Sequence, residues 1–311
     1  MADGRAAVRS DLETPGVVRE ALGYYAYRFL SGAFGLLPAG VVRRVGFGLG
    51  WLGSFIARDR FRMAQRHQAR VGGEGPDLRR RARLVFAHYG RYWAETFWLR
   101  PRRHHSILER TTLEGVERLH AAIATGRGVI VALPHTGNWE VAGLRAAAEG
   151  ARVLAVAEDL GNQRIVDWFV AMRNMMDIDI VIARKGGRVT RDLLERLGAG
   201  GVIALLADRD VTGRGVEAEF FGEITTMPAG PVALADRTGA VLLPVGIYFG
   251  AGDHHRFVIH PAMGIPAGDT AEERVRLGVA KLAGILEEII RVAPEQWHLI
   301  VPNWASDRAS S

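Results

Sequence analysis

His135 has the clearest position for chemistry in this sequence. It follows Val129–Leu133, a short apolar run rich in β-branched residues, which predicts a strand buried on both faces. Pro134 cannot extend a strand ladder, and Gly137 and Asn138 supply turn and N-cap residues, so we expect a helix to follow. Ligands of open parallel sheets bind at such strand-to-helix junctions. A histidine there can act as a general base if an acceptor holds its other ring nitrogen.

Two carboxylates compete to be that acceptor. Glu140 follows His135 after four intervening residues and lies in the first turn of the predicted helix, where its side chain can point along the helix instead of back. Asp208 follows another predicted strand, Val202–Ala207. Because the ends of neighbouring parallel strands meet at one rim of a sheet, we favour Asp208 over Glu140 as the partner of His135.

A third carboxylate, Glu158, ends the predicted strand Val153–Ala157 and reaches the same rim. An ion pair with Arg164 or Arg173 is the alternative to a supporting role of Glu158 in the site. Arg173 lies on the helix that follows this strand. Its planar guanidinium suits binding of an anionic group of a ligand.

The elements that position these residues alternate between strand and helix patterns from Leu113 onward, as is typical of a parallel sheet. The predicted strands are Val129–Leu133, Val153–Ala157, Ile178–Ile182, Val202–Ala207, Val241–Tyr248 and Arg256–His260. The predicted helices are Trp139–Ala148, Gln163–Met175, Val189–Leu197, Gly230–Thr238 and Ala271–Val292. We expect an α/β fold with a mostly parallel central sheet, helices on both of its faces and a helical amphipathic region at the N-terminus.

The charge is unevenly distributed along the 311 residues. Residues 1–110 carry eleven more basic than acidic side chains, and residues 111–311 carry five more acidic than basic ones. We therefore separate a basic N-terminal helical region, 1–110, from an α/β core, 111–311, and expect both to pack as one compact unit. A cationic region suits an anionic membrane surface or a nucleic acid, and the lack of a nucleic-acid-binding motif favours the membrane.

Two apolar stretches of the N-terminal region, at about Phe29–Val42 and Val45–Ala57, are each shorter than the ~20 residues that span a bilayer. Arg43 and Arg44 divide them. They predict two amphipathic helices in a membrane interface, or a hairpin that dips into it, with ordinary helices packed on the core as the alternative. We also expect an aromatic helix over Leu78–Leu99. Its aromatic side chains pack in the core or, alternatively, form a wall of a site for an aliphatic chain.

Several kinds of site are not expected. The chain has no cysteine, which excludes disulfides and a thiol nucleophile. The adjacent His104 and His105 cannot face the same way on a helix or strand, so we expect no metal ion there. No glycine-rich phosphate-binding motif opens a helix after the first predicted strand, so we expect no nucleotide cofactor.

The segment Leu133–Glu140 resembles the His-(four residues)-Asp/Glu motif of glycerolipid acyltransferases. More narrowly, the chain is similar to the lipid A late acyltransferase superfamily and its phosphatidylinositol mannoside acyltransferase branch. The similarity continues in order through Ala157-Glu158, the helix that carries Arg173, Ala207–Asp210, Phe220–Glu223, Met227–Pro231 and Trp297-His298. These blocks span more than half of the chain.

This resemblance implies transfer of a long acyl chain from acyl-CoA, as donor substrate, to a sugar hydroxyl of a membrane glycolipid, here a mannose of phosphatidylinositol mannosides. It implies that His135 is the base and Asp208 its acidic partner, although that branch has the longer Glu at the second position. Arg173 matches an arginine implicated in ligand binding, and Arg214 and Arg237 occupy positions near the ligands. The resemblance also implies a peripheral location on the cytoplasmic face of the cell membrane. It implies no cofactor.

A thioester is already activated, so a general base suffices and no covalent enzyme intermediate is needed. We expect backbone N–H groups at the start of the helix after Gly137 to stabilise the oxyanion, and apolar and aromatic side chains to line a tunnel for the acyl chain. The alternatives are an enzyme of the lipid A type with another glycolipid acceptor, an acyl-CoA thioesterase that uses His135 toward water, or a membrane-binding scaffold without catalysis.

Overall fold

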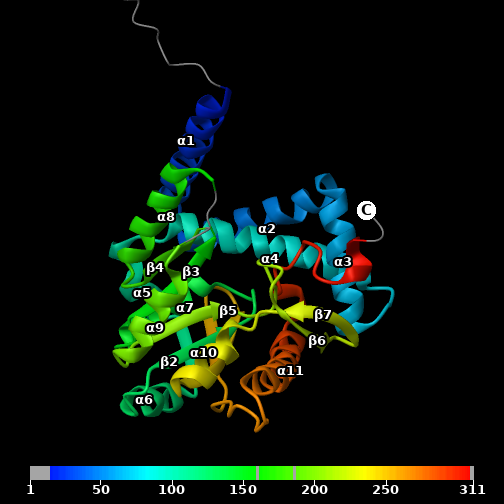
Figure 1. The fold of residues 1–311 in the computed structure, drawn as a ribbon. Helices are drawn as coiled ribbons and strands as arrows, with labels where there is room; N and C mark the ends of the chain where they lie inside the picture. The colour runs from blue at the N-terminus through cyan, green and yellow to red at the C-terminus, as the bar shows by residue number, and fades with distance from the viewer. Residues whose placement is uncertain (1–14, 159–160, 185–186, 309–311) are drawn as a thin grey trace, which may run out of the picture.

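A seven-stranded sheet runs through the centre of the computed structural model, which describes residues 15–158, 161–184 and 187–308 (Figure 1). The strand order is β1-β9-β8-β2-β5-β3-β4, and every neighbouring pair is parallel except β8 and β9. The strands are β1 (Thr111–Glu114), β2 (Val129–Leu133), β3 (Val153–Glu158), β4 (Asp179–Ala183), β5 (Val202–Leu206), β8 (Val241–Phe249) and β9 (His255–Ile259). The predicted α/β class with a mostly parallel sheet is confirmed.

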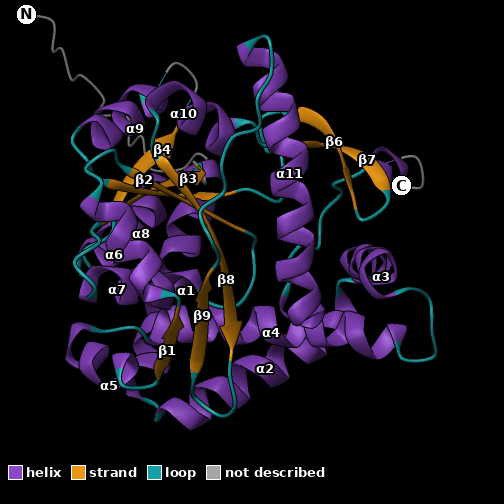
Figure 2. Cartoon of the chain, turned by 90° about the horizontal axis from the view of Figure 1, so that it is seen from below, coloured by secondary structure: helices purple, strands orange, loops and turns teal. Residues whose placement is uncertain are grey.

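Helices cover both faces of this sheet, as predicted (Figure 2). One face carries α6 (Val116–Ala124), α7 (Trp139–Ala148) and α8 (Gln163–Asn174). The other carries α9 (Val189–Gly198), α10 (Gly230–Thr238) and α11 (Ala271–Val292). The remaining helices are α1 (Pro15–Leu36), α2 (Ala39–Ile56), α3 (Arg58–Gly72), α4 (Leu78–Trp98), α5 (His104–Leu108) and α12 (Ala305–Arg308), with short 3-10 turns at Pro101–Arg103 and Pro294–Gln296.

The side chains of each strand point alternately to the two faces of the sheet, and they divide the interior into two cores. In β2, Val129 and Leu133 belong to the core shared with α7 and α8, whereas Ile130 and Ala132 belong to the core under α9, α10 and α11. Successive side chains of a strand point to opposite faces, so this division follows from the pleat. All six predicted strands are present, with ends within one residue of the prediction, because buried parallel strands have a strong apolar signal.

Sequence patterns missed β1 and a separate antiparallel hairpin, β6 (Val216–Phe220) and β7 (Glu223–Met227). Phe221 and Gly222 form its turn, with φ angles of 52° and 77°. Two successive positive φ angles give the hairpin turn that matches the twist of paired strands. A bulky residue in this left-handed region is uncommon, which explains why the turn was not predicted.

The N-terminal region is helical, but its first boundary differs from the prediction. Arg43 and Arg44 lie within α2, and the break between α1 and α2 falls at Leu37 and Pro38 instead. Proline lacks an N–H group and disfavours a helical conformation of the residue before it, so Pro38 sets this boundary. Side chains from both sides of residue 110, such as Phe97 and Leu144, share one core.

Candidate active site

The parallel pairing of β2 with β5 brings His135 and Asp208 together. Leu133 lies opposite Leu206, so the residues two positions further along each chain meet at the carboxyl end of the sheet. His135 Nδ1 lies 2.7 Å from Asp208 Oδ1, and the backbone N–H of His135 donates to Oδ2 at 3.1 Å. The predicted contact between these two side chains is confirmed, and the short aspartate side chain is long enough to make it.

Asp208 is fully buried and is held as a carboxylate. Burial alone raises the pKa of this group, but the neighbouring His135 and the N–H groups of His135 and Trp297 hold it below its ordinary value. Trp297 Nε1–H donates to Asp208 Oδ2 at 2.7 Å. An ionised carboxylate only accepts hydrogen bonds, so His135 Nδ1 is the donor, and in the neutral ring Nε2 is the nitrogen with the lone pair. The His135 side chain is 24% exposed.

The C-terminal Trp297-His298 pair fixes the loop that carries His135. The backbone N–H of His298 donates to the carbonyl of His135 at 2.8 Å, and His298 Nε2–H donates to the carbonyl of Gly137 at 2.9 Å. Burial lowers the pKa of His298 to about 3, although the bond to Gly137 opposes this shift. His298 is therefore neutral and has a structural hydrogen bond to the loop.

Asn138 starts α7 and links it to α4. Its side-chain oxygen accepts from the N–H groups of Glu140 and Val141 at 3.2 and 3.3 Å, which is an N-cap. Its amide nitrogen donates to Glu95 at 2.9 Å, and Glu95 also accepts from Arg91 at 2.8 Å. The prediction that N–H groups at the start of this helix stabilise an oxyanion is therefore wrong for Glu140 and Val141, whose N–H groups are already bonded.

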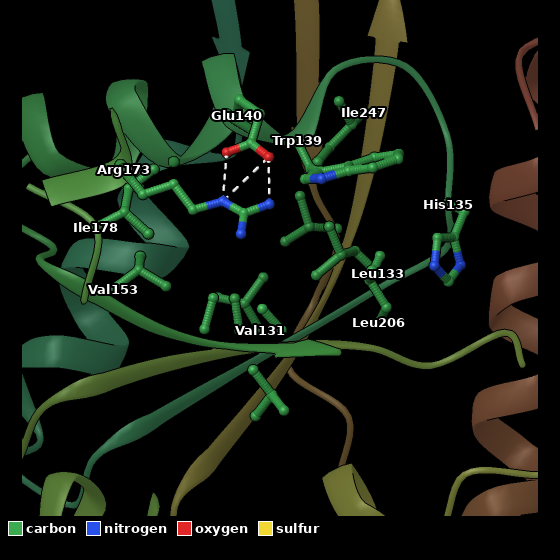
Figure 3. A pocket seen from close by; sticks show the side chains of 18 of the residues that line it. Val131, Leu133, His135, Trp139, Glu140, Val153, Arg173, Ile178, Leu206 and Ile247 are labelled. Atoms are coloured by element: carbon green, nitrogen blue, oxygen red, sulfur yellow. Dashed lines mark hydrogen bonds and ion pairs between the residues drawn. The ribbon is translucent and has the colours of Figure 1, made fainter. Parts of the chain in front are cut away.

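Glu140 faces Arg173 of α8 instead of His135, and both side chains lie in the cavity wall (Figure 3). Arg173 Nη2 lies 2.6 Å from Glu140 Oε1, and Arg173 Nε lies 2.9 Å from Oε2. Burial lowers the pKa of Arg173, but the Glu140 carboxylate raises it to above its ordinary value. Glu140 is thus not the partner of His135, and the Arg173 charge that was expected to bind an anion is neutralised by Glu140.

Glu158 also differs from the prediction. Its exposed carboxylate pairs neither with Arg164 nor with Arg173, and the ion-pair partner that the described residues give it is Arg209, at 4.0 Å. Arg209 follows Asp208 directly. Glu158 and Arg209 both line the cavity beside His135, so the expected position of Glu158 at the rim is correct but its partner is not.

An apolar cavity of about 430 Å³ extends from His135 along the face of the sheet that α7 and α8 cover (Figure 3). It reaches from the carboxyl ends of the strands, at Leu133 and Leu206, to their amino ends, at Val153 and Val202. Small side chains leave this space open: Ala142, Gly143, Ala146, Ala155, Ala157 and Ala204. Tyr89, Tyr92 and Trp93 of the aromatic helix α4 complete the wall.

The other two predicted ligand-binding arginines do not line this cavity. Arg214 is exposed in the loop between β5 and β6. Arg237 is exposed in the last turn of α10, which leads into the start of β8 and so lies near the opposite end of the sheet from His135. Their substrate contacts stay predictions without geometric support. Sequence reasoning missed Arg60 and Arg209, which do line the cavity. No local pattern links α3 to the strand ends, and no local pattern shows that the side chain after Asp208 faces a cavity.

A histidine–aspartate pair whose second ring nitrogen bonds no other described residue, placed at the end of an apolar cavity in an α/β fold, defines an enzyme site for a substrate with a long apolar part. Comparison with known proteins specifies the class. Residues 17–306 match the model of the family described as bacterial lipid A biosynthesis acyltransferase. The chain belongs to this family, and it is an acyltransferase.

Relatives within this family narrow the comparison. The chain is 32% identical over 288 residues to a phosphatidylinositol mannoside acyltransferase of Mycobacterium tuberculosis. The aligned region covers 85% of this chain and 89% of the relative. It is 33% identical over 299 residues to the protein of the same name from Mycolicibacterium smegmatis, covering 89% of this chain and 96% of the relative. The resemblance inferred from the motifs is confirmed.

Proposed function

We propose that this protein is an acyl-CoA-dependent O-acyltransferase that moves a long fatty acyl chain to a sugar hydroxyl of a membrane glycolipid, namely a mannose of phosphatidylinositol mannosides. The observation that carries this proposal is the free Nε2 of His135 at the end of the apolar cavity. The acceptor is inferred from the names of the two relatives, which are both phosphatidylinositol mannoside acyltransferases.

His135 acts as the general base. Its Nε2 takes the proton of the acceptor hydroxyl while that oxygen attacks the thioester carbonyl, and Asp208 stabilises the imidazolium that forms. The tetrahedral intermediate then collapses, the carbon–sulfur bond breaks, and the proton on Nε2 passes to the leaving CoA sulfur. General base catalysis of this kind contributes about 10²–10⁴-fold in rate.

The cavity holds the acyl chain. Its lining is apolar except near His135, at the Glu140–Arg173 pair and at a few charged groups on its borders. Burial of each methylene group contributes about 0.8 kcal/mol, so a long chain has a large affinity for such a site. The neutral Glu140–Arg173 pair does not place a net charge against the chain.

We place the protein on the cytoplasmic face of the cell membrane, attached through α1 and α2. Among the described residues, no helix is long and apolar enough to cross a membrane. One stripe of α2 nevertheless exposes Leu49, Leu52 and Ile56, with 56%, 59% and 83% of their surfaces accessible. The exposed Arg44 lies on the same helix, and the exposed Arg58 is the first residue of α3. This combination suits insertion into an interface with anionic lipids.

The proposed activity is tested by supplying palmitoyl-CoA and phosphatidylinositol dimannoside to the purified protein. We expect equal amounts of free CoA and acylated glycolipid, identified by mass spectrometry. Release of palmitate at the same rate with and without the acceptor would show a thioesterase instead. An acylated product only with a different glycolipid acceptor would keep the transferase but remove the mannoside.

The membrane attachment is tested by flotation with vesicles of anionic and of neutral lipids. We expect binding to anionic vesicles that weakens as salt is added, because screening reduces surface attraction. The variants Leu49→Glu and Leu52→Glu should lose this binding. Ile224→Glu is the matched control, since Ile224 is 57% exposed but lies on β7. Equal losses for all three variants, or binding that ignores lipid charge and salt, would contradict the assignment.

A further inference from the structure

We propose that Arg60 and Arg209 bind a phosphate group of a substrate at the mouth of the cavity, which we define by Arg60, His135, Glu158 and Arg209. This inference rests on the proposed acyl transfer. The phosphate belongs either to the diphosphate of CoA or to the phosphodiester of the glycolipid. Both substrates carry such a group outside the part that enters an apolar cavity.

The charged groups of the cavity wall single out these two arginines. Six arginine and glutamate residues of the described chain line the cavity: Arg60, Glu140, Arg145, Glu158, Arg173 and Arg209. Arg173 is paired with Glu140 at 2.6 Å, and Arg145 is paired with Glu149. The charges that remain for a ligand are those of Arg60 and Arg209, together with the single carboxylate of Glu158.

Arg209 is fixed next to the reacting group. It follows Asp208, whose side chain bonds to His135 and whose carbonyl accepts from Asn303 at 3.2 Å. The Arg209 side chain is 31% exposed, and Glu158 lies 4.0 Å from it while being 56% exposed itself. An exposed pair at that distance is weak, so a phosphate can replace Glu158 as the partner of Arg209.

Arg60 lines the cavity from α3. It is exposed and has no hydrogen bond or ion pair with another described residue, unlike Arg62 on the same helix, which pairs with Asp59 at 3.0 Å. The helix itself is held firmly. His67 Nδ1–H donates to the carbonyl of Leu299 at 2.9 Å, and Arg70 pairs with Asp307 at 2.9 Å.

The segment that holds α3 also borders the cavity. Residues Leu299, Ile300 and Val301 line it, and they follow His298, whose backbone N–H donates to the carbonyl of His135. The position of Arg60 is therefore tied to the His135 loop through this segment. A guanidinium has several N–H groups in one plane, which suits phosphate oxygens, and a fixed backbone lowers the cost of binding them.

The experiment compares Arg60→Gln and Arg209→Gln with two controls that make the same change in charge. Arg62→Gln lies on the same helix as Arg60, and Arg127→Gln changes an exposed arginine shortly before β2, but neither residue lines the cavity. Michaelis constants are measured for palmitoyl-CoA against palmitoyl-pantetheine, which lacks phosphate. They are also measured for phosphatidylinositol dimannoside against an alkyl mannoside without phosphate.

We expect Arg60→Gln and Arg209→Gln each to raise the KM of a phosphate-bearing substrate about tenfold or more, the effect of one charge-assisted contact, without changing the KM of its phosphate-free analogue. A rise for palmitoyl-CoA alone assigns the CoA diphosphate, and a rise for the glycolipid alone assigns its phosphodiester. Unchanged constants for both phosphate-bearing substrates, or equal changes in the controls, overturn the proposal.

A binding measurement separates this proposal from the proposed function. Calorimetry with CoA and with the water-soluble, deacylated dimannoside headgroup reports phosphate binding without turnover. If the wild-type protein transfers no acyl group, the proposed function fails. Weaker binding of either probe by the two variants than by their controls then still supports the phosphate site, and equal binding overturns it.

Discussion

Among the described residues, two histidine–aspartate pairs, each with a buried aspartate, differ in what surrounds them. In the first, His135 uses Nδ1 to bond Asp208 at 2.7 Å, its Nε2 bonds no other described residue, and its side chain lines the cavity. In the second, His67 is 1% exposed and uses both ring nitrogens, Nδ1 toward the carbonyl of Leu299 at 2.9 Å and Nε2 toward Asp307 at 3.3 Å.

The difference shows that residue types alone do not make a catalytic site. A general base needs a free nitrogen and room for a substrate, and only the His135 pair among these two has both. The His67 pair joins α3 to the C-terminal segment, where Asp307 also bonds the N–H groups of Asn303 and Trp304. It therefore has a structural role, and the two pairs should respond to mutation in opposite ways.

The largest effect is expected for His135→Ala. Transfer should fall about 10⁴-fold, the upper range for loss of a general base. The protein should stay folded with some loss of melting temperature, because the buried Asp208 loses its side-chain partner but keeps the N–H groups of Trp297 and of the backbone of residue 135. Steady-state transfer and thermal unfolding are measured on the same sample. Full activity of this variant would show that the base is another residue.

Asp208→Asn should lower kcat by about 10²-fold or more, because the amide no longer stabilises the imidazolium. Glu140→Gln is the comparison. It leaves the buried Arg173 without its carboxylate, so it should lower the unfolding free energy while the folded fraction keeps most of its activity. A greater loss of activity per folded molecule in Glu140→Gln than in Asp208→Asn would reverse our choice of partner.

Asp307→Asn tests the structural pair. Although burial opposes it, hydrogen bonds from His67 and from the N–H groups of Asn303 and Trp304 hold the pKa of Asp307 below its ordinary value. Removing a buried charge from its partners costs about 3–5 kcal/mol, which urea unfolding should detect. Activity per folded molecule should stay within about twofold of the wild type, because Asp307 takes no part in general base catalysis. Loss of turnover without loss of stability would contradict this assignment.

The two faces of the sheet offer a further comparison. Ala204 faces the cavity, whereas Ala132 is fully buried in the filled core on the opposite face. Ala204→Leu should fill part of the cavity and lower kcat/KM for palmitoyl-CoA more than for octanoyl-CoA, with little loss of stability. Ala132→Leu should cost about 1–3 kcal/mol through overpacking without changing the preference for chain length. Equal chain-length profiles of the two variants would show that the acyl chain lies elsewhere.

The smallest effect concerns acid stability. The pKa of His298 is about 3 in the folded protein, against about 6.5 in an unfolded chain. Below pH 6.5 the unfolded chain therefore binds a proton that the folded protein does not, and this site lowers the unfolding free energy by up to about 1.4 kcal/mol per pH unit toward pH 4. His298→Gln should remove that part of the slope in urea unfolding at pH 7 and pH 5. His88, with a pKa of about 4, contributes to the same slope in the wild type and in His298→Gln, so part of the slope should remain. A slope that does not change at all would show that His298 does not contribute to the pH dependence of the unfolding free energy.

The sequence by itself determined six of the seven strands of the sheet and favoured the pairing of His135 with Asp208. Buried parallel strands are continuous apolar runs, so β2 and β5 are visible locally, and neighbouring parallel strands end at one rim. The ends of α7, α10 and α11 were also predictable, because caps, glycines and the apolar stripe are local signals.

Only the tertiary structure decided which groups surround the pair. Glu140 turns to Arg173, Glu158 to Arg209, and Arg60 arrives from a helix far away in the chain. The direction of a side chain and the space left by small residues depend on packing between distant segments, and no periodicity encodes them. For the same reason the His135 and His67 pairs, built from the same residue types, differ in the presence of a cavity.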